Sequence, residues 1–254
     1  MGKSISEIKK ELEQVPLEEL SACMAQFESD ERKGVKTLLA SCQKKLDREA
    51  AEQLRLDTML EFERANSSYC HICGIDEAGR GPLAGPVVAG AVILPKECKI
   101  RYLNDSKKLS ASRREELFDE IREKAVASAV GIVSPARIDE INILQATYEA
   151  MRQAISKLTT SPDLLLNDAV IIPQVEIPQI PIIKGDARSM SIAAASILAK
   201  VTRDRLMVEY DKIMPEYGFA GHKGYGSAAH IEVLKKLGPS PIHRKTFIGH
   251  FVEV

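Results

Sequence analysis

The chain has 254 residues, of which 44% are hydrophobic and 28% charged, a composition typical of globular proteins. Its formal net charge of −1 excludes bulk positive charge as a basis for binding nucleic acid, so any such contact needs a local basic patch. No apolar run reaches the roughly 18–20 residues of a membrane helix, and the first residues lack the apolar core of a secretory signal. With five cysteines, these features predict a cytoplasmic protein with reduced thiols and no membrane contact.

Residues 1–68 are predicted to form a helical extension. They carry 11 Lys and Arg against 14 Asp and Glu, a net charge of −3. Apolar residues recur at helical spacing on both sides of Pro16, Ser4 and Glu7 have the spacing of a capping box, and the run from 36 to 65 contains no Gly or Pro. We expect two short helices and one long one, which either pack on the rest of the chain or bind a protein partner. Their negative charge disfavours general DNA binding.

From residue 69 onward, β-branched runs alternate with helical patterns, which indicates an α/β domain over residues 69–254. The expected strands are 69–76, 87–94, 126–133, 164–167 and 182–184. The expected helices are 110–124, 135–158, 190–214 and 228–237. Only a turn and one helix separate the first three strands, so we expect a mixed sheet rather than a purely parallel one.

Four carboxylates are predicted to lie at the ends of strands. Asp76 and Glu77 end the first strand, Asp168 ends the fourth, and Asp186 follows the fifth. Each of the last two taken alone is also explained as a turn or cap residue. Four carboxylates at one edge of a sheet, however, repel each other unless cations lie between them. Oxygen ligands suit Mg²⁺, and two such ions support in-line phosphoryl displacement.

A turn rich in glycine and proline, residues 79–86, follows the first strand. It lacks the Lys and Ser or Thr of a phosphate-binding P-loop, its glycine spacing differs from that of a dinucleotide-binding loop, and a strand follows it instead of a helix. Its glycines expose backbone groups that a sugar-phosphate chain can approach closely. The alternative is a tight turn that carries Arg80 on the surface.

Several motifs together resemble bacterial ribonuclease HII. Residues 74–86 read GIDEAGRGPLAGP and residues 104–109 read NDSKKL; residues 184–187 read KGDA, with SIAAASILAKVTRD at 191–204, and residues 222–226 read HKGYG. The resemblance covers about residues 69–250 in the same order. It implies a ribonuclease H-like fold, with a five-stranded mixed sheet flanked by helices, to which residues 1–68 add the helical extension.

The resemblance also implies the metal site. Members of this family hold two Mg²⁺ or Mn²⁺ ions with an Asp-Glu-Asp-Asp set, which maps onto Asp76, Glu77, Asp168 and Asp186. The family usually has an apolar residue before the third of these acids, where this chain has Asn167. Asp163 is the alternative for that position, but it precedes the strand and is expected at its opposite end.

The implied activity is endonucleolytic. Such enzymes cleave the RNA strand of RNA/DNA hybrids and incise duplex DNA on the 5′ side of a single embedded ribonucleotide, leaving 5′-phosphate and 3′-hydroxyl ends. The resemblance assigns recognition of the ribonucleotide to the glycine turn and to a tyrosine, here Gly79, Arg80, Gly81 and Tyr225. Phosphate contacts are expected from Lys107, Lys108, Lys184 and Arg188. Residues 184–254 carry a local net charge of +4, which supports a side that faces the duplex.

Two other functions are carried as alternatives. The first is a ribonuclease of the same fold that acts on long hybrids alone; the second is a nucleic-acid-binding module without catalysis. The Gly-Arg-Gly turn and Tyr225 disfavour the first, and four carboxylates beside phosphates disfavour the second. The histidines at 222, 230, 243 and 250 are expected to be loop or surface residues rather than general bases, and the chain is expected to act as a monomer.

Overall fold

The computed structural model describes residues 3–253. The chain forms two compact units, Met1–Asp57 and Thr58–Val254. The second unit therefore includes α4 (Glu61–Ala65), which the sequence prediction assigned to the N-terminal extension. No helix within residues 3–253 combines the length and the apolar character that crossing a lipid bilayer requires.

The first unit consists of helices, as predicted. They are α1 (Ile5–Gln14), α2 (Leu17–Ala25) and α3 (Lys33–Thr58). Ser4 and Glu7 form the predicted capping box at the start of α1. The apolar faces meet in a small core of buried side chains: Ile8, Leu12, Leu20, Cys23, Phe27 and Val35.

The long helix predicted up to residue 65 ends earlier, and this is a correction. The chain leaves helical geometry at Met59 and Leu60, both of which are buried, and starts again as α4. The carbonyl of Met59 accepts a hydrogen bond from the backbone N–H of Met190 at 2.9 Å. A tertiary contact thus replaces the next helical hydrogen bond, which sequence periodicity does not reveal.

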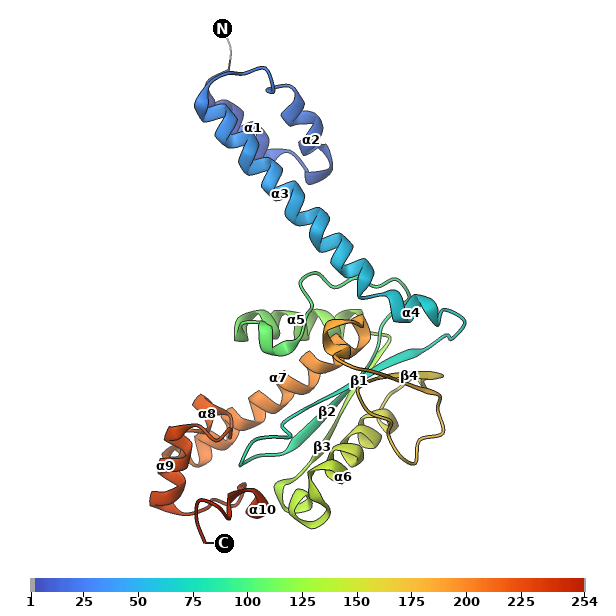
Figure 1. The fold of residues 1–254 in the computed structure, drawn as a ribbon, viewed down its shortest axis with the longest axis vertical. Coiled ribbons are helices and arrows are strands. Elements are labelled where there is room, and N and C mark those ends of the chain that lie inside the picture. The colour runs from blue at the N-terminus through green and yellow to red at the C-terminus, as the bar shows by residue number, and fades with distance from the viewer. Residues whose placement is uncertain (1–2, 254) are drawn as a thin grey trace. The chain divides into compact units, whose positions relative to one another are not determined.

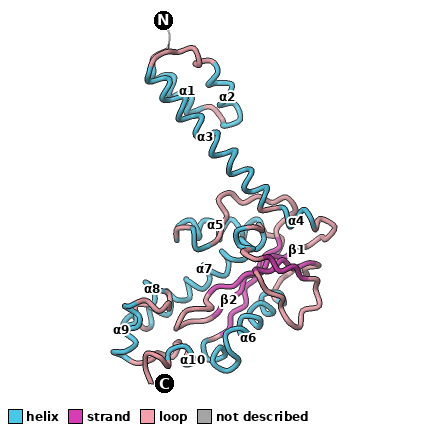
Figure 2. Tube along the Cα trace, viewed as in Figure 1, coloured by secondary structure: helices cyan, strands magenta, loops and turns pink. Residues whose placement is uncertain are grey.

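The second unit contains a five-stranded mixed sheet, as predicted, in the order β3-β2-β1-β4-β5. Figure 2 shows its strands in magenta. Its strands are β1 (Ile72–Ala78), β2 (Val87–Ile93), β3 (Ala127–Val133), β4 (Leu164–Asp168) and β5 (Gln179–Ile182). The pairs β1–β2 and β2–β3 are antiparallel, whereas β1–β4 and β4–β5 are parallel. The carboxyl ends of β1, β4 and β5 therefore lie at one edge of the sheet.

The fifth strand lies earlier than predicted. We expected residues 182–184, but Ile183 is 73% exposed and Lys184 has a left-handed backbone with φ of 57°. The chain instead pairs with β4 through Gln179–Ile182, which contains Pro181. Proline is tolerated there because β5 is an edge strand and needs fewer backbone donors.

Helices cover both faces of this sheet (Figure 1). On one face lies α7 (Met190–Ile213), with α5 (Ala111–Lys124) packed against it; on the other lies α6 (Pro135–Ser156). The backbone of α7 approaches β1 so closely that a Cβ at Gly74 would lie 2.0 Å from the carbonyl carbon of Ser191. This contact fixes α7 against the strand that carries Asp76.

Two further features differ from the sequence prediction. The helix α6 is kinked at Asn142, whose φ is 67° and whose side chain accepts hydrogen bonds from the two N–H groups that start the second half. Short elements were not predicted because one or two turns leave no periodic pattern. They are η1 (Ser106–Lys108), η2 (Gly185–Ala187), η3 (Pro215–Tyr217), α8 (Phe219–His222) and α10 (Lys245–Ile248). The predicted helix near residue 228 is present as α9 (Ala228–Leu237).

Candidate active site

Asp76 and Glu77 lie near the carboxyl end of the central strand β1. Asp76 is 6% exposed and accepts a hydrogen bond of 2.7 Å from the backbone N–H of Glu77. Burial raises the pKa of Asp76 well above its ordinary value, and the nearby charges of Glu77 and Asp168 raise it further. The Ser196 hydroxyl acts in the opposite direction by hydrogen bonding to this carboxylate. Asp76 is thus a buried carboxylate whose negative charge is poorly compensated.

The parallel neighbour β4 brings Asp168 to the same edge. Ile75 pairs with Asn167, so Asp76 and Asp168 are the next residues along two adjacent strands. The buried Asn167 side chain donates hydrogen bonds to the Val170 carbonyl and the Gln179 side chain. The polar residue at this position therefore secures the loop that follows β4, and it does not displace Asp168 from the strand end.

Asp186 completes the acidic group from the turn η2. The backbone N–H of Gly185 donates a hydrogen bond of 2.7 Å to Asp168, which holds this turn against the end of β4. Asp186 is 8% exposed. Burial raises its pKa, and the charges of Asp105 and Asp168 add to this effect. The four predicted acids are therefore electrostatically coupled across three neighbouring segments.

Two cations act on this acidic group. Burial raises the pKa of Glu77, while Arg80, at 3.3 Å, lowers it. Burial tends to lower the pKa of Lys107, but the attraction of acidic neighbours outweighs it and raises that pKa; these neighbours are Asp105, Asp186, Asp76 and Asp168. Lys107 therefore contributes a positive charge to the acidic edge.

The donor chemistry of these acids fits hard divalent cations. Every candidate ligand is a carboxylate oxygen, and the raised pKa values of Asp76, Glu77 and Asp186 indicate excess negative charge that a bound cation would relieve. Within residues 3–253, no three acidic, His or Cys side chains converge closely enough to form a ready-made metal cage. Among hard divalent cations, Mg²⁺ retains waters and takes few protein ligands together with substrate phosphate.

Asp163 lies outside this group, as expected. Its carboxylate accepts hydrogen bonds from the backbone N–H groups of Cys70 and His71, at 2.7 and 2.8 Å, before β1 and β4 begin. Although burial acts to raise it, these hydrogen bonds lower the pKa of Asp163 overall. It serves as a structural anchor at the opposite end of the strands.

An open cleft of about 590 Å³ adjoins the acidic edge. Seven of the predicted site residues line it: Asp76, Glu77, Gly79, Arg80, Gly81, Lys107 and Tyr225. Five other predicted residues do not line this cleft: the acids Asp168 and Asp186, and the exposed cations Lys108, Lys184 and Arg188. Arg188 instead lies over the ring of Phe62, with its guanidinium carbon 5.0 Å from the ring centre.

Besides Ala78, four polar cleft residues were not singled out from the sequence: Ser106, Arg114, Ser196 and Lys200. Ser196 and Lys200 are polar positions four residues apart within the otherwise apolar stretch 192–201 of α7, a spacing that places them on one helical face. That pattern was available in the sequence as a signal. No sequence signal marks Arg114, because its guanidinium donates hydrogen bonds to the backbone carbonyls of Ser106 and Leu109, and every residue has such a carbonyl.

Two buried arginines, Arg203 and Arg244, hold the glycine turn. Both are fully buried, and all their hydrogen bonds go to backbone carbonyls. Arg203 donates to Ala84, Pro86 and Lys223; Arg244 donates to Gly79, Arg80 and Gly85. Gly79 has φ of 95°, and a Cβ there would lie 2.2 Å from Nε of Arg203. The two buried arginines thus hold the turn from the protein interior, while Arg80 and Gly81 are exposed beside the acids.

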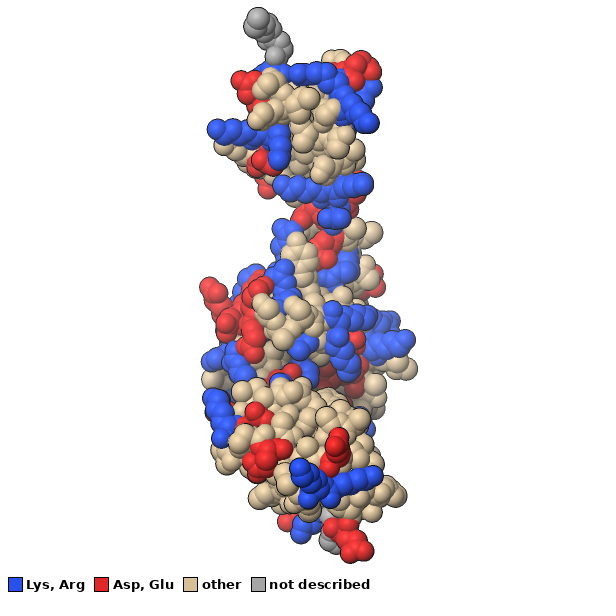
Figure 3. All heavy atoms as spheres, turned by 90° about the vertical axis from the view of Figure 1, so that its left-hand side faces the viewer, with Lys and Arg blue, Asp and Glu red and all other residues tan. Residues whose placement is uncertain are grey.

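Tyr225 lies where this cleft meets a second groove of about 660 Å³ along α7. Its side chain is 43% exposed, with the ammonium of Lys200 5.6 Å from the ring centre. Arg114, Lys200 and Tyr225 line both hollows, so the two form a continuous path. On the face of the sheet-containing unit that Figure 3 shows, groups of Lys and Arg lie beside Asp and Glu.

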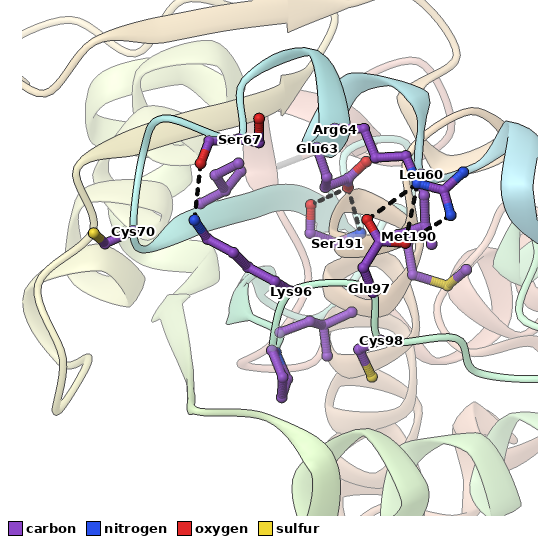
Figure 4. A pocket seen from close by; sticks show the side chains of 13 residues that line it. Leu60, Glu63, Arg64, Ser67, Cys70, Lys96, Glu97, Cys98, Met190 and Ser191 are labelled. Atoms are coloured by element: carbon purple, nitrogen blue, oxygen red, sulfur yellow. Dashed lines mark hydrogen bonds and ion pairs between the residues drawn. The ribbon is translucent and has the colours of Figure 1, made fainter.

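A separate pocket of about 50 Å³, shown in Figure 4, contains none of the four acids. Glu63 of α4 accepts hydrogen bonds there from the Ser191 hydroxyl, at 2.7 Å, and from the Ser191 backbone N–H. The Ser189 hydroxyl also donates to Glu63, at 2.6 Å. Glu63 thereby caps the start of α7, where a carboxylate is favourable. This contact stabilises the helix that carries Ser196 and Lys200.

The fold is shared with solved nucleases. The crystal structure of ribonuclease H2 from Pyrococcus horikoshii superposes with a TM-score of 0.58 and 32% sequence identity, covering 69% of this chain and 93% of that one. The mixed five-stranded sheet, its flanking helices and the acidic edge define a hydrolase of the ribonuclease H-like class.

Sequence comparison narrows this class. Residues 73–250 match the family Ribonuclease HII, and residues 4–67 match Ribonuclease HII N-terminal domain. The chain is 62% identical to ribonuclease HII of Lachnoclostridium phytofermentans over 98% of both chains, and 52% identical to that of Clostridioides difficile over 98% and 99%. The chain belongs to the ribonuclease HII family, whose members are divalent-metal-dependent endonucleases with ribonuclease H activity on RNA/DNA.

Proposed function

We propose that this protein is a two-metal endoribonuclease that incises duplex DNA 5′ to a single embedded ribonucleotide and also cleaves the RNA strand of RNA/DNA hybrids. The products would carry 5′-phosphate and 3′-hydroxyl ends. The observation that carries the proposal is that Asp76 and Glu77 of the acidic edge line one cleft together with the Gly79-Arg80-Gly81 turn and Tyr225. The same cleft thereby combines carboxylates suited to metal-assisted hydrolysis with groups suited to recognising the sugar of the substrate.

We assign metal binding to Asp76, Glu77, Asp168 and Asp186. Two Mg²⁺ or Mn²⁺ ions held there would supply Lewis acidity to the attacking water and to the leaving 3′-oxygen. The chain itself supplies orientation: Asp168 holds the turn of Asp186 through Gly185, and the Glu77 N–H orients Asp76. Lys107 and Arg80 would neutralise phosphate charge beside the acids. We propose that Lys108, Lys184 and Arg188, which are exposed and lie outside the cleft lining, contribute less to phosphate binding than Lys107 does.

Recognition of a lone ribonucleotide must depend on its 2′-hydroxyl, the group that distinguishes it from its neighbours. Gly81 supports this assignment, because a Cβ built there meets no protein atom within 4 Å. The fold alone therefore does not require glycine at this position, and the space is suited to a close approach by the substrate backbone. Tyr225, partly exposed on the same cleft, offers a ring for packing on the adjacent sugar and a hydroxyl for hydrogen bonding.

The remaining proposals concern the location of the protein, its oligomeric state and the roles of its two parts. We propose that the protein acts as a cytoplasmic monomer, with residues 69–254 as the catalytic domain. For residues 1–68, the net charge of −3 favours contact with a protein partner over contact with DNA.

The test is a labelled DNA duplex with one ribonucleotide, incubated with Mg²⁺ or Mn²⁺ beside an all-DNA duplex and a long hybrid. We expect incision only on the 5′ side of the ribonucleotide, together with cleavage of the hybrid. Cleavage of the long hybrid alone would overturn the proposed recognition and leave a hybrid-only ribonuclease. Binding without turnover of either ribonucleotide-containing substrate would instead indicate a non-catalytic module.

A further inference from the structure

Three histidines, His222, His230 and His243, pack together beside the loop that carries Tyr225. His230 is fully buried within α9, which corrects the expectation that it is a loop or surface residue. His243 lies in a loop, as expected, but is only 4% exposed. The rings of His222 and His230 stack with their centres 4.1 Å apart. Nε2 of His230 lies 3.0 Å from Nε2 of His243.

The hydrogen bonds of this cluster have one consistent direction. The backbone N–H of Ser240 donates to Nδ1 of His243 at 2.9 Å, so a neutral His243 carries its proton on Nε2. That proton is donated to Nε2 of His230, whose own proton is then on Nδ1. Nδ1 of His230 donates to the backbone carbonyl of Tyr225 at 2.9 Å. An added proton on either ring would place two donors face to face, so both histidines are neutral in this arrangement.

This arrangement excludes two simpler roles. The two ring nitrogens of His222 contact the Tyr217 carbonyl and the Gly224 N–H, so each nitrogen of the three rings has a hydrogen-bond partner. No lone pair is therefore free to bind a metal ion. Neither His230 nor His243 lines the cleft, which excludes direct general-base catalysis.

The contacts around the two buried histidines extend to the glycine turn. The segment 242–244 pairs with residues 83–85 through the Gly85 N–H to the Ile242 carbonyl at 2.8 Å and the Arg244 N–H to the Leu83 carbonyl at 2.9 Å. On the other side, Leu83 N–H donates to Gly224, whose φ is 82°. A Cβ at Gly224 would lie 2.4 Å from the carbonyl oxygen of Ala84. Residues 83–85 of the glycine turn are thus hydrogen-bonded both to the segment 242–244 and to Gly224 in the loop that carries Tyr225.

We propose that His230 and His243 are positioning residues that fix Tyr225 relative to the glycine turn. They act through a hydrogen-bonded chain from Ser240 to the Tyr225 backbone. This inference rests on the role given to Tyr225 under the proposed function. Burial lowers the pKa of both histidines, and that of His243 to about 4, which agrees with the neutral forms that the hydrogen-bond directions require.

The test is a double-mutant cycle with the long hybrid and the single-ribonucleotide duplex as substrates. His230→Leu is expected to lower kcat/KM about tenfold or more when Tyr225 is present, but less than about twofold in a Tyr225→Ala background. His230→Asn, whose amide can replace the Nδ1 donor, is expected to retain most of the activity. The matched control is His250→Leu, at an exposed histidine, which is expected to leave kcat/KM unchanged.

Several outcomes would overturn the proposal. Equal losses from His230→Leu in both backgrounds would show a general structural effect instead of action through Tyr225. Full activity of His230→Leu would remove the positioning role. An unchanged rate for Tyr225→Ala on both substrates would refute the proposed role of Tyr225, and the inference with it.

A second measurement does not depend on activity or on the fate of the leucine variant. Nitrogen-15 NMR of the imidazoles in the unmodified protein is expected to show a proton on Nδ1 of His230 and on Nε2 of His243. Observation of the reverse tautomers, or of charged rings at neutral pH, would refute the hydrogen-bonded chain even if Tyr225 proves essential for incision.

Discussion

The guanidinium of Arg244 donates a hydrogen bond of 2.6 Å to the backbone carbonyl of Gly79, 165 positions earlier in the chain. The same group reaches the carbonyls of Arg80 and Gly85, each at 2.9 Å. Burial, reinforced by the nearby Arg203, lowers the pKa of Arg244 to about 9. This buried cation therefore has a structural role: it holds the turn that we assign to substrate recognition.

The first prediction concerns Arg244→Lys. Lysine has no planar fork and cannot satisfy three carbonyls in fixed directions, so we expect a loss of about 1–3 kcal/mol in the free energy of unfolding. Cleavage of the hybrid should fall as the turn loosens. Urea unfolding measures the first effect and a hybrid assay the second. The control is Arg205→Lys, at an exposed arginine paired with Glu115, which should change stability by less than about 0.5 kcal/mol. Equal effects of the two changes would contradict this account.

The second prediction compares Gly81→Ala with Gly79→Ala. The added methyl at Gly81 meets no protein atom, so stability should change by less than about 0.5 kcal/mol while incision falls about tenfold or more. At Gly79, the positive φ and the contact with Arg203 should reduce both stability and activity. Thermal unfolding and the single-ribonucleotide assay distinguish the two cases. An active Gly81→Ala variant would show that the substrate does not approach this position closely.

The predictable part of the molecule is the part encoded in local patterns. The mixed sheet follows from runs of β-branched residues and the short connections between them, and the resemblance carried the family assignment. The sequence predicts Asp76 at a strand end because it follows an apolar run, and Asp168 because only Asn167 separates it from one. In the structure Asp168 ends β4, and Asp76 lies two residues before the end of β1. Asp186 lies near the same edge, as predicted, even though β5 ends earlier than predicted, at Ile182. The reason is that Asp168 accepts a hydrogen bond from the Gly185 N–H and so holds the turn that carries Asp186.

The unpredicted part depends on contacts between distant segments. The acceptors of Arg203 and Arg244 are backbone carbonyls, which every residue has, so no side-chain pattern marks them. The hydrogen bond between His230 and His243 likewise joins α9 to a later loop. The end of α3 at Met59 is set by a contact with Met190. Each of these features requires knowledge of which segments meet in space.

The third prediction concerns stability between about pH 6.5 and pH 4. The folded protein lowers the pKa of His243 to about 4, whereas the unfolded chain has the ordinary value of 6.5. The unfolded state therefore binds more protons in this range, and stability is present above pH 6.5 and lost as the pH falls towards 4. His243 contributes roughly 3 kcal/mol at most to this loss. Comparison with His243→Gln, which cannot titrate, cancels the effect of the carboxylates common to both proteins. The variant should show a shallower decline; parallel curves would contradict the prediction.

The fourth prediction concerns Asp76→Asn. The amide keeps the acceptor for the Glu77 N–H but removes a buried charge that Glu77 and Asp168 disfavour. We expect metal-free stability to rise by about 1 kcal/mol while hybrid cleavage falls more than about 100-fold. Mn²⁺ at 100 times its Kd should stabilise the unmodified protein by about 2.7 kcal/mol, and the variant much less.

The control for this experiment is Asp163→Asn. Asp163 lies at the opposite end of the strands, where it accepts hydrogen bonds from Cys70 and His71. The change should lower stability but leave the response to Mn²⁺ unaltered. Equal Mn²⁺ stabilisation of the Asp76→Asn variant and the unmodified protein would contradict the assignment of Asp76 as a ligand.

The fifth prediction distinguishes two adjacent lysines that the sequence alone made equivalent. Lys107 lines the cleft, and the negative charges of the acidic group raise its pKa, whereas Lys108 lies outside the cleft lining. A phosphate bound beside the acids gains more from a cation close to it than from one that is solvated and screened. Lys107→Met should therefore lower kcat/KM for the hybrid about tenfold, and Lys108→Met less than about twofold.

Salt dependence adds an independent measurement. If Lys107 contacts one phosphate, the slope of log binding affinity against log salt concentration should become shallower by about one in Lys107→Met. The slope for Lys108→Met should remain close to that of the unmodified protein, because an exposed lysine outside the cleft releases few counterions on binding. Equal changes in both variants would mean that the duplex extends over Lys108 as well, and that cleft lining alone does not select the cations that contact phosphate.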